Sequence, residues 1–136
     1  MTQAFPVTIY HNPDCGTSRN ALAMIEAAGQ APTIVEYRQS GWTRPLLEQL
    51  LTAMKASPRD LLREKGTPAA ELGLLAPSVT DDALIAAMLA HPILVNRPIV
   101  ATPKGTKLCR PSELVLDLLE NAPAQFTKED GEIVRR

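Results

Sequence analysis

The apolar positions of this sequence follow first the pattern of a strand, then that of a helix, then that of a strand again. Residues 6–10 form a short β-branched and aromatic run before a proline-bearing turn, which predicts a buried strand. Apolar residues then recur at helical spacing over residues 17–28, and Gly29 is a helix stop signal. Residues 33–37 again favour a strand. We therefore predict a β-α-β unit with parallel strands and a right-handed connection.

The middle of the chain has the pattern of amphipathic helices. Residues 43–54 place leucines and Met54 along one face, and residues 80–89 begin with acidic residues, where the helix dipole is positive. Between them, Ser57 followed by Pro58 is typical of a helix start with the serine as its cap. We predict a helical insertion over about residues 43–91.

After the insertion the sequence becomes extended again. The stretch around Arg97-Pro98 favours a strand, residues 103–106 a turn and residues 107–109 a second short strand, which together predict a β-hairpin. A final helix is expected over residues 111–119. The remaining residues, 121–136, are polar and charged, and we expect them to be partly ordered.

This order of elements is that of a thioredoxin-like domain with extra helices in its middle. We predict an α/β protein with a mixed four-stranded sheet, built from β-α-β followed by a β-hairpin and a helix. A chain of 136 residues is large enough to bury a hydrophobic core, and it contains no internal repeat. One domain over residues 1–136 accounts for the pattern.

Composition and charge argue against several classes of partner. The chain is 45% hydrophobic and 21% charged, with a formal net charge of −1, so no global basic field favours nucleic acid or an anionic membrane. No apolar run approaches the ~20 residues of a membrane span. The first residues lack the basic flank and apolar core of a signal peptide. We expect a cytoplasmic protein, and a monomer.

Cys15 lies between the first predicted strand and the first predicted helix. A thiol in this place is near the unpaired amides and the positive end of the helix, which stabilise a thiolate and lower the thiol pKa. Gly16 lets the chain turn tightly, Ser18 can donate a hydroxyl hydrogen bond, and a positive His11 would also favour the thiolate. Cys15 is therefore a candidate nucleophile, although a buried free cysteine can also be simple core packing.

The spacing around Cys15 argues against other thiol chemistries. A dithiol site needs a cysteine at position 18, where the sequence has serine, and a phosphatase-type loop needs an arginine at position 21, where it has alanine. A metal held by His11 and Cys15 would need further ligands, but the other histidine and cysteine, His91 and Cys109, are distant in the sequence. We expect no metal, and we expect Cys109 to belong to the core. The resolving thiol must come from Cys109 or from another molecule.

Positive charge for an oxyanion at Cys15 must come from elsewhere in the chain. Arg63 lies in the helical insertion, Arg97 precedes a proline that enters a strand, and Arg110 follows the last short strand. Guanidinium groups stay charged and offer paired donors that suit tetrahedral oxyanions. Each of these arginines, taken alone, can also be a solvated surface charge.

Three long motifs in this order resemble the glutaredoxin-coupled arsenate reductases. They are His-Asn-Pro-Asp-Cys-Gly-Thr-Ser-Arg-Asn at 11–20, His-Pro-Ile-Leu-Val-Asn-Arg-Pro-Ile-Val at 91–100 and Leu-Cys-Arg-Pro-Ser-Glu at 108–113. The resemblance extends to Arg63 in its Leu-Leu-Arg context and to Phe126-Thr-Lys-Glu-Asp-Gly near the end. It implies a thioredoxin-like fold with a helical insertion, and a cis peptide bond before Pro98.

The resemblance also implies a reaction. Cys15 would attack arsenate to form a covalent thioarsenate, glutathione would attack the arsenic, and a glutaredoxin would reduce the adduct and release arsenite. Glutathione would act as a co-substrate, with no bound cofactor.

Site residues follow from the same resemblance. His11 would help to lower the thiol pKa and Ser18 would bond the thiolate, while the oxyanion would be bound by Arg63, Arg97 and Arg110, with Gly16 and Thr17 beside it.

Two other functions share these features. A related protein of the same fold could use Cys15 to reduce a different substrate with glutathione, although such relatives lose some of the oxyanion arginines. A redox-sensing regulator that binds RNA polymerase would use a Cys-x-x-Cys pair, which Ser18 removes. The arsenate reductase interpretation accounts for more of the residues than either alternative.

Overall fold

The chain divides into two compact units in its computed structural model, which describes residues 5–135. The first unit comprises residues 5–36 and 97–135, and the second comprises residues 37–96. The helical insertion expected at about residues 43–91 lies inside the second unit, which extends a few residues further at both ends. That the whole chain works as one domain stays a prediction.

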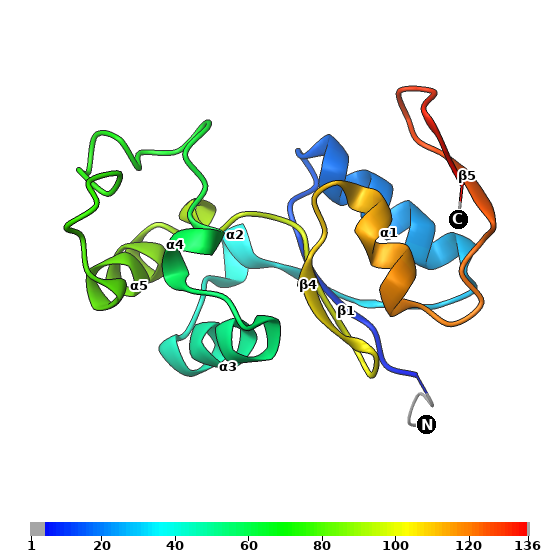
Figure 1. The fold of residues 1–136 in the computed structure, drawn as a ribbon, viewed down its shortest axis with the longest axis horizontal. Helices are drawn as coiled ribbons and strands as arrows, with labels where there is room; N and C mark the ends of the chain where they lie inside the picture. The colour runs from blue at the N-terminus through cyan, green and yellow to red at the C-terminus, as the bar shows by residue number, and fades with distance from the viewer. Residues whose placement is uncertain (1–4, 136) are drawn as a thin grey trace. The chain divides into compact units, whose positions relative to one another are not determined.

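The first unit is built on a mixed four-stranded sheet with the order β2-β1-β3-β4 (Figure 1). The central strand β1 (Thr8–His11) pairs in parallel with β2 (Thr33–Glu36) and antiparallel with β3 (Ile99–Thr102). A hairpin then joins β3 to β4 (Gly105–Leu108). This is the mixed sheet predicted from the sequence, with the parallel pair supplied by the β-α-β unit.

Two helical segments lie side by side on one face of this sheet (Figure 1): α1 (Gly16–Ala27) and η2 (Ser112–Leu118), which is a 3₁₀ helix. The helical spacing of α1 turns its apolar stripe inward, so that Ala21, Met24 and Ile25 are fully buried. The core they enter is made of apolar side chains from the sheet and from η2, among them Val7, Ile9, Val100, Val115, Leu116 and Leu118. This packing fixes the start of α1 against the end of β1.

Two details of the first unit differ from the prediction, and its last segment is more regular than expected. The hairpin strand begins at Gly105, earlier than expected, and Cys109 follows the strand instead of lying in it. The final helix is a 3₁₀ helix, whose first turn is closed by Leu114 N–H donating to Pro111 O at 3.1 Å. The end of the chain forms a second hairpin of β5 (Gln125–Thr127) and β6 (Ile133–Arg135), and Phe126 and Val134 pack against the core.

The second unit is helical. It contains α2 (Tyr37–Ser40), α3 (Arg44–Met54), α4 (Pro58–Leu61), α5 (Asp81–Ala90) and the 3₁₀ helix η1 (Pro92–Leu94). The predicted helix starts are confirmed, because Thr43, Ser57 and Thr80 are the N-caps of α3, α4 and α5, and their side chains accept backbone N–H bonds. Among the described residues, no helix has the length and apolar character needed to span a bilayer.

Candidate active site

Cys15 is the N-cap of α1, and the residue is 8% exposed. The turn that leads to it is tightly bonded: Cys15 N–H donates to Asn12 O at 3.0 Å, and Asp14 N–H donates to Asn12 Oδ1 at 2.9 Å. This turn brings the thiol from the end of β1 to the first turn of α1, where the backbone N–H groups have no partner within the helix. The prediction that Cys15 lies at a helix N-terminus is confirmed.

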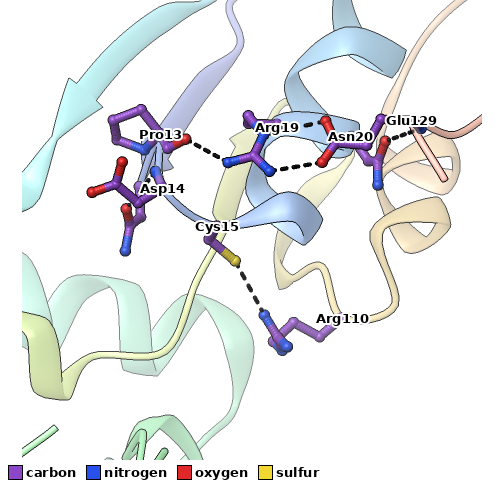
Figure 2. Close-up of polar contacts among 8 residues, drawn as sticks. Pro13, Asp14, Cys15, Arg19, Asn20, Arg110 and Glu129 are labelled. Atoms are coloured by element: carbon purple, nitrogen blue, oxygen red, sulfur yellow. Dashed lines mark hydrogen bonds and ion pairs between the residues drawn. The ribbon is translucent and has the colours of Figure 1, made fainter. Parts of the chain in front are cut away.

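Two arginines of the same unit, Arg97 and Arg110, lie at this thiol, and Figure 2 shows the contact of Arg110. Arg110 Nη1 is 3.7 Å from the Cys15 sulfur and also donates to the carbonyl oxygen of Arg97 at 3.0 Å. The arginines come from the two ends of the β3–β4 hairpin, because Arg97 precedes β3 and Arg110 follows β4. Cys15, Arg97 and Arg110, predicted from separate motifs, are thus brought together by the sheet.

The pKa of Cys15 is lowered to about 7 from an ordinary value of 9.0. Burial acts against this change and raises the pKa, but it is outweighed by hydrogen bonding to the Arg97 guanidinium, to the Ser18 backbone N–H and to Arg110, and by the charge of Arg97. At neutral pH a large fraction of the thiol is therefore thiolate, the form that acts as a nucleophile.

His11 and Ser18 form a buried pair behind the cysteine turn. His11 Nδ1 lies 2.6 Å from Ser18 Oγ, and the same oxygen accepts the Asn12 N–H at 3.1 Å. The group of Ser18 that lowers the thiol pKa is its backbone N–H. A bond from the Ser18 hydroxyl to the thiolate, and an effect of a positive His11, stay predictions.

Arg63 belongs to the second unit. Its backbone N–H donates to Leu94 O at 2.7 Å, and its Nε donates to Lys65 O at 3.1 Å. Its role at the oxyanion stays a prediction, as does substrate binding by Gly16 and Thr17, which open α1 directly after Cys15.

The second cysteine has a different environment. Cys109 is fully buried in the core of the first unit, and burial raises its pKa to about 12. It is therefore a neutral thiol at physiological pH, as expected of a core residue. The part of the chain that the structure describes contains no group of three His, Cys, Asp or Glu side chains arranged to hold a metal ion.

Arg19 belongs to the motif at residues 11–20, but nothing in the sequence predicts its partner. Its guanidinium forms a two-pronged ion pair with Glu129, between β5 and β6, with a shortest distance of 2.7 Å (Figure 2). The two residues are 110 positions apart, so no local pattern joins them. The only signal was the motif at residues 126–131, which was noted as part of the resemblance without a role.

Comparisons with known proteins relate this chain to one family. The ArsC family model matches residues 10–118. The chain is 58% identical over 129 residues to an arsenate reductase of Synechocystis sp., covering 94% of this chain and 92% of the relative, and 57% identical to an arsenate reductase of Escherichia coli with the same coverage. Among solved structures, an arsenate reductase from Vibrio cholerae superposes with a TM-score of 0.80 at 38% identity, covering 86% of this chain and 100% of the other.

Proposed function

The chain belongs to the ArsC family, and we propose that it is an arsenate reductase in which Cys15 is the nucleophile and glutathione and a glutaredoxin supply the electrons. The observation that carries the proposal is the Cys15 thiol at the start of α1, with its pKa lowered to about 7 beside Arg97 and Arg110. The site thus has a nucleophile that is partly ionised at neutral pH and fixed positive charge for an oxyanion.

The first step joins sulfur to arsenic. The Cys15 thiolate attacks the arsenic of arsenate, an S–As bond forms, and an oxygen leaves as water after it is protonated. Arsenic stays pentavalent in this step. Arg97 and Arg110 stabilise the negative charge on the remaining oxygens without transferring a proton, and Arg63 is proposed to join them.

The second step needs thiols from other molecules. Position 18 is serine, and Cys109 is buried with a raised pKa, so neither can resolve the adduct. Glutathione displaces a second oxygen as water and gives an adduct with arsenic between two sulfurs. The glutaredoxin thiolate then attacks the glutathione sulfur, the As–S electron pair stays on arsenic, and arsenic becomes trivalent. Water releases arsenite and restores the Cys15 thiol.

The experiment follows NADPH oxidation by purified protein with arsenate, glutathione, a glutaredoxin and glutathione reductase. We expect oxidation that depends on arsenate, is abolished in Cys15→Ser and is mostly retained in Cys109→Ser. Turnover by Cys15→Ser would contradict the assignment of Cys15 as the nucleophile. A folded, reduced wild-type protein that consumed no NADPH with arsenate would contradict the assignment of arsenate as the substrate, and activity on another oxidised substrate would favour a different glutathione-dependent reductase.

A cytoplasmic location is part of the proposal, because the reaction needs reduced glutathione.

A further inference from the structure

Arg19 contacts the turn before Cys15 and the C-terminal hairpin at the same time (Figure 2). Its Nη1 donates to the carbonyl oxygen of Pro13 at 2.8 Å, while its Nε and Nη2 donate to the two carboxylate oxygens of Glu129 at 3.2 and 2.7 Å. The backbone N–H of Glu129 in turn donates to Asn20 Oδ1 at 3.0 Å. One guanidinium thus joins the cysteine turn, the start of α1 and the loop between β5 and β6.

Gly16 gives a second, independent sign that this pair belongs to the site. A Cβ atom at Gly16 would lie 3.1 Å from Glu129 Oε1 and 3.6 Å from Arg19 Nη2. The ion pair therefore packs on the residue that directly follows the candidate nucleophile.

The hairpin that carries Glu129 is itself held in place. Phe126 and Val134 pack against the core of the first unit, and Lys128 Nζ lies 2.9 Å from Glu113 Oε1 on η2. Glu129 is therefore presented by an anchored element. An ion pair whose side chains are 44% and 46% exposed adds little to overall stability, so its main effect is on local geometry.

We propose that Arg19 and Glu129 are positioning residues, which hold the turn from Pro13 to Cys15 against the first turn of α1. The sulfur must stay aligned with the Ser18 N–H and with Arg110, and both contacts depend on where this turn places Cys15. The proposal rests on the proposed function only in taking Cys15 as the working thiol.

Geometry and simple charge effects predict opposite results for Glu129→Gln. Removing a negative charge near a thiolate would stabilise the thiolate, so electrostatics alone predicts faster alkylation at low pH. Breaking the two-pronged pair would loosen the turn and weaken the contacts of the sulfur, so positioning predicts slower alkylation.

The charged and titratable groups around the thiol are His11 from β1, Asp14 from the turn, Arg19 from α1, Arg97 and Arg110 from the ends of the β3–β4 hairpin, and Glu129 from the C-terminal hairpin.

The experiment measures the rate at which iodoacetamide alkylates Cys15 between pH 5.5 and 8.5. It uses wild type, Arg19→Ala, Glu129→Gln and the double variant. We expect each single change to slow alkylation at pH 6 by about threefold, with the midpoint of the pH profile moved upward, and the double variant to be no slower than the slower single variant. Alkylation of Arg19→Lys should also be slow, because lysine keeps the positive charge but cannot form the two-pronged pair with Glu129.

Asp117→Asn is the matched control. It removes another exposed ion pair of the same unit, between Lys107 and Asp117 at 3.5 Å, and we expect it to leave the alkylation profile unchanged. Circular dichroism checks that each variant is folded, and Arg19→Lys takes the place of Arg19→Ala in the cycle if the alanine variant does not fold.

Two results would overturn the proposal. One is unchanged or faster alkylation in Glu129→Gln, and the other is a double variant in which the two effects multiply, as for independent residues. The measurement uses no arsenate, so its outcome is separate from that of the reductase assay: a wild type without reductase activity would refute the proposed function and leave the positioning result standing.

Discussion

Helices α1 and α5 begin in opposite ways. At α5, the Thr80 side chain accepts the Ala83 N–H at 3.2 Å, and Asp81 and Asp82 place negative charge in the first turn. At α1, the N-cap is Cys15, which offers a sulfur that bonds the Ser18 N–H in place of a capping oxygen, and the first turn contains no acidic residue. The start of α5 is therefore satisfied by its own residues, while the start of α1 keeps its N–H groups and its positive dipole available for an anion.

The difference shows that a helix starting at a reactive thiol lacks the stabilisation that a capping side chain provides. Serine, threonine, aspartate and asparagine are the residues that cap helices best, and replacing such a cap by alanine costs about 1 kcal/mol. α3 and α4, like α5, have such caps in Thr43 and Ser57. Among these four helices, the one that carries the candidate nucleophile is the one whose cap position has no side-chain oxygen. That position holds the Cys15 thiol instead.

The largest expected effect comes from removing charge at α1. Arg110→Ala removes a guanidinium 3.7 Å from the Cys15 sulfur. We expect kcat/KM for arsenate to fall about 10²-fold or more, because both the thiolate and the developing charge on the oxyanion lose a donor. The NADPH-coupled assay measures this loss, and Arg110→Lys should recover part of it. Full activity in Arg110→Ala would show that the helix start alone suffices.

A smaller effect concerns stability and pH. The pKa of Cys15 is about 7 in the folded protein and 9.0 ordinarily, so the folded state binds fewer protons than the unfolded state between these values, and stability rises with pH there. Relative to Cys15→Ser, we expect the free energy of unfolding of wild type to rise by about 2 kcal/mol between pH 7 and 9. This gain is lost as pH falls through 7. Urea unfolding at several pH values measures it.

The raised pKa of Cys109 changes stability with pH in the opposite direction. Its contribution is fully present below pH 9 and is lost only as pH rises toward about 12. Since Cys109 is present in both proteins, the difference between wild type and Cys15→Ser reports Cys15 alone. Parallel pH curves for the two proteins would contradict the lowered pKa.

The smallest effect tests α5. Thr80→Ala removes the cap of a helix whose start has no chemical task, and we expect a loss of about 1 kcal/mol in the free energy of unfolding. The rate of Cys15 alkylation should not change. Urea unfolding and the alkylation assay measure both quantities on the same sample. A changed alkylation rate would show that the two helix starts are coupled.

Local patterns in the sequence predicted much of this molecule. The apolar spacing of α1 and α3, the cap at Ser57 and the β-branched run of β1 all depend on residues a few positions apart. The position of Cys15 at a helix start is of the same kind. The cis bond before Pro98, expected from the resemblance alone, is also present.

Other features depend on contacts that no local pattern encodes. Gly105 joins β4 because Thr102 pairs with it across the turn. The segment after residue 120 forms a hairpin because Phe126 and Val134 pack against the core of the first unit. The second cis bond, between Arg110 and Pro111, was not expected from any motif.

The sequence by itself therefore determined most of the elements, the candidate nucleophile and the family, because these rest on short-range periodicity, on residue chemistry and on motifs. Only the tertiary structure decided that Arg97 and Arg110 meet at Cys15, that Cys109 is buried with a raised pKa, and that Arg19 pairs with Glu129. The physical reason is distance along the chain: the charges and burial that set these pKa values and contacts come from residues that only folding brings together.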